Sequence, residues 1–158
     1  MSTAASQTIV LREGREASLR RRHPWVFSGA IGRKVGEPAA GDIVEVRSAA
    51  GEFLARGYYN PASSLAVRVL TWEEATPVGP DLWRGRLAAA LRRRQALAVD
   101  PGTGAYRLVY AESDGLPGLI VDRYGDWLVL QSLTLGMDAL KGEIVSALVD
   151  LTAPRGIF

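Results

Sequence analysis

The sequence predicts an α+β protein with a small β pseudo-barrel at its N-terminal end, a linker helix, and a small strand-rich α/β domain that is incomplete. Three observations lead to this prediction. Short apolar segments separated by turns fill residues 8–75, a spacing typical of a small barrel. A segment with helical spacing follows a proline-rich break. Strand-like segments and turns then alternate over residues 104–158.

The N-terminal module is expected to begin after a short disordered tail. Residues 1–7 lack the apolar stretch of a signal peptide, so we expect them to be frayed. A short helix is expected over residues 15–22, and Pro24 should end it because the residue before a proline avoids helical angles. Strands are expected at residues 43–46, 52–59 and 65–72.

A domain boundary is expected at residues 76–80, which are proline-rich and uncharged. Asp81 is placed to cap a helix over residues 82–99. Trp83, Leu87 and Leu91 recur every four residues and predict the buried stripe of that helix. We therefore assign residues 76–103 to a linker that contains a helix.

The last module is expected to hold strands, a hairpin and a helix. Residues 106–111 are strand-like, and a turn follows at 115–118. A hairpin is expected around Tyr124-Gly125-Asp126. Leu140, Ile144, Leu148 and Leu151 have helical spacing, and residues 156–158 resemble the start of another strand. A domain that ends by starting a strand suggests truncation.

Composition excludes several classes of protein. The chain has 158 residues, a hydrophobic fraction of 47% and no cysteine, which excludes a disulfide framework, a thiolate metal site and a cysteine nucleophile within these residues. No apolar run approaches the roughly 20 residues that a membrane helix needs. We therefore expect a cytoplasmic protein with no membrane partner.

Positive charge is concentrated near the N-terminus. Seven Lys and Arg residues and two Glu residues lie between Leu11 and Lys34, giving +5 in a chain whose net charge is only +2. Such a concentration indicates a polyanionic partner. The side chains predicted to contact phosphates are Arg15, Arg20, Arg21, Arg22 and Lys34.

Aromatic residues beside these cations suggest stacking on exposed bases. Trp25 or Tyr58 could supply the ring, although a core position for Trp25 is an equal alternative and Phe27 is assigned to the core. His23, the only histidine, could equally make a structural hydrogen bond or an RNA contact. Arg56 is a second-rank candidate for RNA contact.

No catalytic, cofactor or metal site is predicted. Gly102-Thr103-Gly104 is interpreted as a turn, because a nucleotide-binding glycine loop must follow a strand and open a helix. The acidic residues of the last module are interpreted as water-exposed turn residues rather than as metal ligands or acid–base catalysts: Glu112, Asp114, Asp122 and Asp126.

Three motifs in order resemble the N-terminal part of bacterial large-subunit ribosomal RNA cytosine-5 methyltransferases. They lie at residues 14–31 (GREASLRRRHPWVFSGAI), 54–63 (LARGYYNPAS) and 106–125, which includes ESDGLPGLIVDRYG. Together they extend over nearly all of the chain from Ile9 onward.

This resemblance implies an N-terminal PUA domain at residues 8–75 and a central α/β domain at 104–158. It also implies a catalytic domain that binds S-adenosylmethionine and supplies a cysteine nucleophile. The chain has no cysteine and no recognisable cofactor loop, so we expect RNA recognition, with large-subunit ribosomal RNA as the partner, and no activity from this chain alone. Two alternatives stay open: a stand-alone RNA-binding PUA protein, or a protein-interaction module that forms a homodimer.

Overall fold

A computed structural model describes residues 7–98 and 104–158. These residues belong to two compact units, Met1–Val78 and Gly79–Phe158, and the division falls inside the proline-rich segment at 76–80. The expected tail, apart from Gln7, lies outside the described residues, and so do Gly102 and Thr103 of the expected turn.

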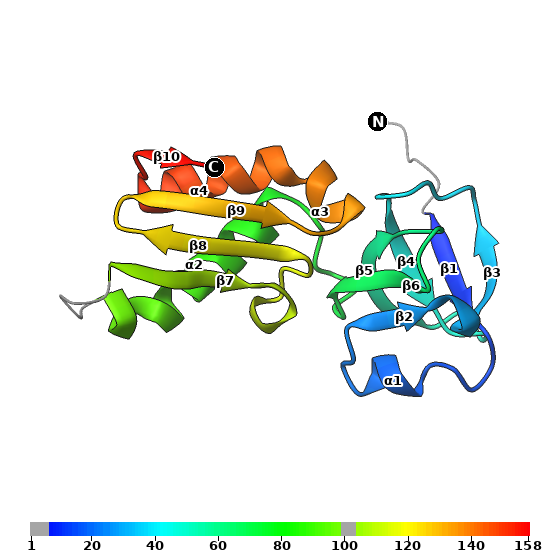
Figure 1. Cartoon of the computed structure of the whole chain (residues 1–158). Coiled ribbons are helices and arrows are strands. Elements are labelled where there is room, and N and C mark those ends of the chain that lie inside the picture. Colours follow the sequence, from blue (N-terminus) through cyan, green and yellow to red (C-terminus); the bar gives the residue numbers. More distant parts are fainter. Residues whose placement is uncertain (1–6, 99–103) are drawn as a thin grey trace. The chain divides into compact units, whose positions relative to one another are not determined.

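The first unit is built on one curved, six-stranded sheet with the order β2-β6-β5-β4-β1-β3 (Figure 1). β1 pairs in parallel with β4, and all other neighbours are antiparallel. The strands are β1 (Thr8–Leu11), β2 (Trp25–Phe27), β3 (Ile31–Val35), β4 (Ile43–Arg47), β5 (Phe53–Tyr59) and β6 (Leu65–Thr71).

The core of this unit lies inside the curved sheet. Ile9, Val44, Val46 and Val67 are fully buried in one cluster, and Leu19 from the short helix α1 (Ala17–Arg20) joins it. β5 and β6 approach closely at Gly57, where an added Cβ would lie 2.2 Å from the backbone oxygen of Arg68. This close approach of the two strands therefore requires a residue without a side chain at position 57.

The arginine-rich segment contains less helix than the sequence suggests. α1 includes only four residues, and Arg22 has a left-handed backbone with φ of 62°. The His23 N–H donates to Ser18 O at 3.0 Å and closes the turn. The helix therefore ends at Arg20. The turn at Arg22 and His23 ends it, and Pro24 does not. The strands β1, β2 and β3 and the 3₁₀ turn η1 (Ser28–Ala30) were not predicted from the sequence.

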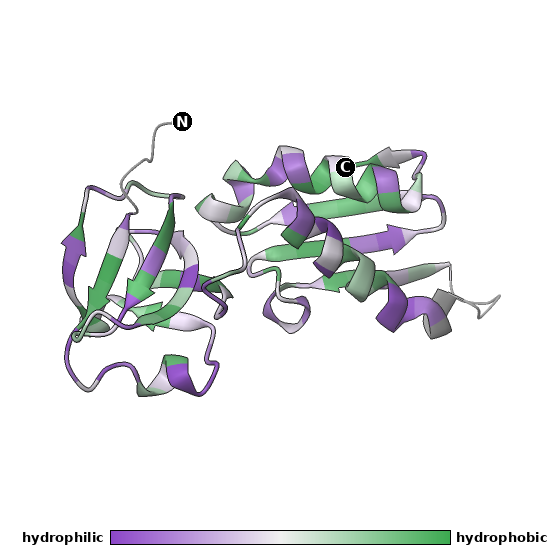
Figure 2. Cartoon of the chain, turned by 180° about the vertical axis from the view of Figure 1, so that it is seen from behind, coloured by the Kyte–Doolittle hydropathy of each residue, from purple (hydrophilic) through white to green (hydrophobic). Residues whose placement is uncertain are grey.

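The second unit is a four-stranded sheet with helices on one face. The strand order is β10-β9-β8-β7, and Figure 2 shows α2 and α4 lying over the sheet. The elements are α2 (Pro80–Ala98), β7 (Ala105–Tyr110), η2 (Ala111–Asp114), β8 (Leu119–Tyr124), β9 (Trp127–Ser132), α3 (Leu135–Ala139), α4 (Lys141–Thr152) and β10 (Gly156–Ile157).

α2 is an integral part of this unit and not a free linker, because it packs against α4 and β7. Its buried stripe is Trp83, Leu87 and Ala90, whereas the predicted third member, Leu91, is only half-buried. The helix begins at Pro80, a favoured first position. Asp81 consequently lies in the first turn and does not cap the helix.

The C-terminal strands agree with the sequence pattern. Tyr124 pairs with Trp127 across the two-residue turn Gly125-Asp126, so the expected hairpin is confirmed. β10 pairs in parallel with β9, which confirms a strand at residues 156–157. Among the described helices, none is both long and apolar enough to cross a membrane.

Candidate nucleic-acid interface

The first unit has a surface hollow of about 430 Å³ beside α1. One wall comes from the loop after β1 and from α1, and the other comes from the end of β2 and from η1. The residues that line it are Gly14, Arg15, Ala17, Ser18, Phe27, Gly29 and Ala30. Only Arg15 among the predicted RNA-binding residues lines this hollow.

Backbone contacts hold the two walls of the hollow together. The Arg12 N–H donates to Ala30 O at 2.9 Å, and the Arg12 side chain donates to Ile31 O at 3.1 Å. The Arg15 N–H donates back to Arg12 O at 3.1 Å. This tight turn, with Gly14 at a φ of 75°, directs the loop past η1 and leaves the Arg15 side chain exposed.

Phe27 supplies an exposed aromatic ring at the hollow, contrary to its predicted core position. Its side chain is 52% exposed, while the neighbouring Val26 is 3% exposed and belongs to the core. A register shift between Val26 and Phe27 accompanies this change in the strand. An accessible ring close to a guanidinium is typical of surfaces on which unpaired bases stack.

The three consecutive arginines have different roles. Arg20 donates to Glu52 at 3.0 Å, and this hydrogen bond raises the pKa of Arg20. Arg22 pairs with Glu73 at 2.9 Å and lies 5.6 Å from the Trp72 ring centre. Within the described part of the chain, Arg21 has no carboxylate partner. Arg21 is therefore the member of the triplet whose charge is not compensated by a neighbouring carboxylate.

Two further cations near the N-terminus are also exposed on β3. Lys34 has its ammonium 5.7 Å from the Tyr59 ring centre, and Arg33 is the neighbouring exposed residue. Neither has a carboxylate partner among residues 7–98 and 104–158. Lys34 was among the predicted phosphate contacts and Arg33 was not, although both contribute to the positive charge of residues 11–34. Neither of them lines the hollow.

Trp25 and His23 form a local aromatic pair outside the hollow. Their ring centres are 5.5 Å apart in an edge-on arrangement, and the Trp25 N–H donates to Nδ1 of His23 at 3.3 Å. Arg68 lies 6.0 Å from the half-buried Trp25 ring. His23 is exposed, so its hydrogen bond is structural while its ring stays accessible.

Burial removes Tyr58 from the candidate RNA contacts. Its side chain is 2% exposed, because β5 lies in the interior of the curved sheet and buries residues on both faces. No base can stack on this ring in the folded unit.

Arg56 has a structural role that sequence alone does not reveal. Its side chain is 17% exposed and pairs with Glu45 at 2.9 Å. It also donates to Thr76 O at 2.8 Å, which ties the segment after β6 to the sheet. Burial raises the pKa of Glu45, but hydrogen bonds from Arg56 and Arg47 outweigh it and lower that pKa overall. We therefore remove Arg56 from the RNA-contact candidates.

In the second unit, Asp114 is buried, contrary to the water-exposed position predicted for it. It is 5% exposed and accepts hydrogen bonds from Arg94 at 2.9 and 2.7 Å, from Arg93 and from the Tyr110 N–H at 2.6 Å. Desolvation raises its pKa, but these hydrogen bonds outweigh it, so the pKa lies below its ordinary value. No group of three metal-ligating side chains exists in the described residues.

Comparison with known proteins relates each part of the chain to RNA methyltransferases. Residues 9–72 match the PUA-like domain family. The "Ribosomal RNA large subunit methyltransferase I" of Citrobacter koseri is 44% identical over 143 residues, which are 90% of this chain and 36% of that protein. The protein of the same name from Shigella boydii is 44% identical over 153 residues, which are 97% of this chain and 39% of that protein.

Solved structures share the fold at low sequence identity. A proposed SAM-dependent methyltransferase from Streptococcus mutans has a TM-score of 0.80 and 18% identity, over 93% of this chain and 38% of that one. A proposed methyltransferase in complex with SAH has a TM-score of 0.81, with 18% identity and the same coverage. The chain thus has a PUA-like domain in an α+β fold, and it spans about two-fifths of the length of the curated relatives it matches.

Proposed function

We propose that this chain is the RNA-recognition portion of a SAM-dependent methyltransferase of large-subunit ribosomal RNA. The PUA-like unit binds the RNA through the hollow beside α1. Arg15 and Arg21 contact phosphates, and the Phe27 ring stacks on an unpaired base.

The observation that carries the proposal is that Arg15 and the exposed Phe27 line the same hollow. An apolar residue that merely completed the core would be buried, and Phe27 is not. The 44% sequence identity to two proteins named as ribosomal RNA methyltransferases supports RNA as the partner. Cytosine-5 as the modified atom rests on the three sequence motifs.

The reaction itself is assigned to the part of the relatives that this chain does not match. S-adenosylmethionine would be bound there, and the nucleophilic thiolate would come from there, since this chain contains no cysteine. The chain alone is therefore expected to bind RNA without methylating it. The separation is physically reasonable because phosphate contacts position a substrate, while a distant pocket acts on one base.

Binding of a fluorescein-labelled ribosomal RNA fragment, measured by anisotropy at low and moderate salt, tests the proposal. The affinity should fall as salt increases, because phosphate contacts release counterions. Arg15→Glu combined with Arg21→Glu should weaken binding at least tenfold and reduce the salt slope by about one to two. Phe27→Ala should weaken binding about fivefold with little change in the slope.

The matched control is Arg92→Glu, which reverses an exposed arginine on α2 and should leave affinity unchanged. An affinity that does not depend on salt would contradict the proposal. It would also be contradicted if Arg92→Glu weakened binding as much as the Arg15 and Arg21 changes.

A further inference from the structure

The sheet of the second unit has a face that no described helix covers. α2 and α4 lie over the opposite face (Figures 1 and 2). Strand register assigns to the open face the residues paired with Tyr124, Asp122 and Ile120. The residues of this face that matter below are Ala105, Arg107, Tyr110, Asp122, Tyr124 and Trp127.

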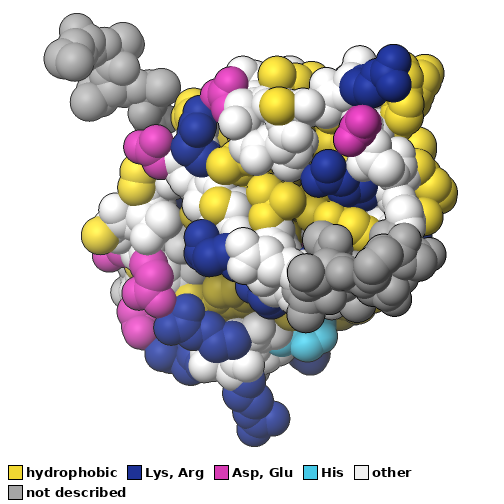
Figure 3. All heavy atoms as spheres, turned by 90° about the vertical axis from the view of Figure 1, so that its left-hand side faces the viewer, with side chains coloured by type: hydrophobic (Ala, Val, Ile, Leu, Met, Phe, Trp, Pro, Cys, Tyr) yellow, Lys and Arg dark blue, Asp and Glu magenta, His cyan; other side chains and the backbone are white. Residues whose placement is uncertain are grey.

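Aromatic rings dominate the exposed part of this face. Tyr110 is 52% exposed, Tyr124 53% and Trp127 39%, and Phe158 follows β10 with 74% exposure. Figure 3 views the chain along the strands of this sheet, and there hydrophobic side chains lie at the surface with Lys and Arg side chains among them. Large rings at several neighbouring surface positions mark a binding surface, because single exposed apolar residues are ordinary and groups of them are not.

One row of residues crosses all four strands and leaves the rings accessible. Tyr124 pairs with Ala105 on one side and with Trp127 on the other, and Trp127 pairs with Gly156. A Cβ at Gly156 would lie 2.5 Å from a ring carbon of Trp127, so the indole lies directly over this glycine. Phe158 continues the aromatic group, with its ring centre 5.5 Å from that of Trp127. Ala105 on β7 and Gly156 on β10 are small, so the rings of Tyr124 and Trp127 have room to lie across the edge strands.

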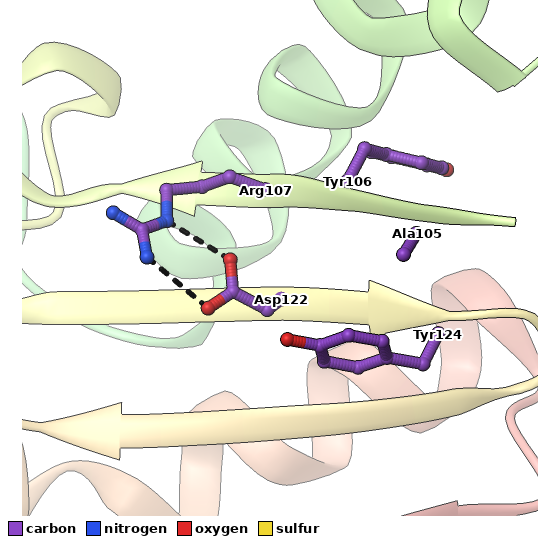
Figure 4. A pocket seen from close by; sticks show the side chains of 5 residues that line it. All are labelled: Ala105, Tyr106, Arg107, Asp122 and Tyr124. Atoms are coloured by element: carbon purple, nitrogen blue, oxygen red, sulfur yellow. Dashed lines mark hydrogen bonds and ion pairs between the residues drawn. The ribbon is translucent and has the colours of Figure 1, made fainter. Parts of the chain in front are cut away.

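An open hollow of about 360 Å³ adjoins this row and contains polar groups. Figure 4 shows Arg107 and Asp122 facing each other across β7 and β8, with the Tyr124 ring beside them. Nε of Arg107 donates to Asp122 at 2.9 Å. The guanidinium is a donor and the carboxylate is an acceptor, so beside a stacking surface this pair can hydrogen-bond the edge of a base.

Two arginines lie over aromatic rings of the same face. The Arg107 guanidinium is 5.3 Å from the Tyr110 ring centre, and a bulge after Arg107 brings both residues to one face. The Arg155 guanidinium is 5.6 Å from the Trp127 ring centre. In the described part of the chain, Arg155 has no carboxylate partner, so its charge is available to a phosphate.

From this arrangement we propose that the open face of β7–β10 is a second RNA-binding surface, specific for unpaired nucleotides. Successive bases stack on Tyr124 and Trp127, Arg155 contacts the backbone, and the Arg107–Asp122 hollow receives a base edge. The proposal takes RNA as the partner from the proposed function, and it adds a contact on a different unit.

The chemistry of the face favours RNA over a second protein chain. Aspartate is depleted in the central part of protein interfaces, whereas here Asp122, hydrogen-bonded to Arg107, occupies the middle of the face. Arginines stacked on rings beside further exposed rings are typical of grooves that bind single strands. A second copy of this chain is the competing occupant, and the experiment distinguishes it.

The test uses the full chain and a fluorescein-labelled oligoadenylate of about eight nucleotides, a length within the range of single-strand binding sites. Tyr124→Ala and Trp127→Ala should each weaken oligoadenylate binding about fivefold to tenfold. Tyr124→Phe keeps the ring and should bind as the unchanged protein does. Val149→Ala is the matched control, because Val149 is 48% exposed on α4 and lies away from the open face.

A second measurement does not depend on the folding of any variant. An oligonucleotide that carries a photoreactive base, crosslinked to the unchanged protein, should label peptides from residues 105–132 and 155–158. Crosslinks confined to residues 7–78 would overturn the proposal, and so would undetectable oligoadenylate binding at low salt. A change in sedimentation on Trp127→Ala, with oligoadenylate affinity unchanged, would assign the face to a second copy instead.

The two proposals can fail separately. If the Arg15 and Arg21 changes leave ribosomal RNA binding intact, the proposed function of the first unit is wrong. If the Tyr124 and Trp127 changes leave oligoadenylate binding intact, only the second surface is wrong.

Discussion

At the scale of single residues, position in the fold decides which partners each charged side chain has. Arg20, Arg21 and Arg22 are consecutive, yet two of them pair with glutamates and only Arg21 has none in the described residues. Counting charges identifies the segment but cannot distinguish its members. Their partners lie about 30 to 50 residues further along the chain, where no local pattern indicates them.

Asp114 is the residue whose removal should destabilise the second unit most directly. Asp114→Asn takes away the charge that the Arg93 and Arg94 guanidiniums and the Tyr110 N–H contact. We expect the free energy of unfolding to fall by about 2–3 kcal/mol, since breaking a buried ion pair leaves a cation without its partner. Urea unfolding followed by circular dichroism measures the change.

The control is Asp138→Asn, which removes an exposed pair with Lys141 and should alter stability by less than about 1 kcal/mol. Equal losses from the two substitutions would show that burial of Asp114 contributes nothing.

Low pH should lower the stability of the second unit, because Asp114 becomes protonated. The pKa of Asp114 in the folded chain lies below its ordinary value of 3.8. Its contribution to stability is complete above that value. It is lost as pH falls through the lower folded pKa, because the unfolded chain binds the proton first. The unfolding free energy of the unchanged protein should therefore decrease below about pH 4, and that of Asp114→Asn should decrease less steeply. Parallel pH profiles for the two proteins would contradict this assignment.

At the scale of elements, irregularities in the strands position side chains of both proposed RNA-binding surfaces. The register shifts at Val26/Phe27 and between Arg107 and Val109 accompany an exposed Phe27 and an Arg107 next to Tyr110. Strand segments and helices follow from hydrophobic periodicity, and the sequence predicted most of them. A bulge depends on how two distant strands meet, so Phe27 was wrongly assigned to the core.

Gly57 tests how closely β5 and β6 must approach. Gly57→Ala should destabilise the first unit by about 1–3 kcal/mol, because the new methyl group would meet backbone atoms that cannot move independently. Gly29→Ala is the matched control, since a Cβ at Gly29 has no atom within 4 Å among those around it. The measurement is the thermal unfolding of both variants. A Gly57→Ala protein as stable as Gly29→Ala would disprove the close approach.

At the scale of the whole molecule, the chain consists of two units, each with buried residues of its own. The sequence placed a boundary at residues 76–80 from prolines alone. The residues of α2 were assigned to a linker, because helical spacing predicts a buried stripe but not the elements that the stripe packs against. The burial of Tyr58 could not be predicted from the sequence either, because it depends on the curvature of the sheet, which buries both faces of its inner strands.

Because each unit has buried residues of its own, we expect that a substitution can destabilise one unit and leave the other unchanged. Gly57→Ala should speed amide hydrogen exchange in peptides from residues 7–78 and leave the rates in residues 104–158 unchanged. Mass spectrometry of the exchanged peptides provides the measurement. Faster exchange throughout the chain would show that the two units unfold together.

The pairing of distant strands in the first unit also has a consequence for the order of folding. β1 pairs with β4, and β2 pairs with β6, so this sheet cannot close during synthesis until residue 71 has left the ribosome. The β7–β8–β9 meander pairs only strands that are consecutive in the sequence, through residues 111–118 and the turn 125–126, and so has a lower contact order. Long-range pairing slows folding because loop closure must precede any gain from contacts. In refolding experiments, the C-terminal meander should therefore form before the six-stranded sheet of the first unit.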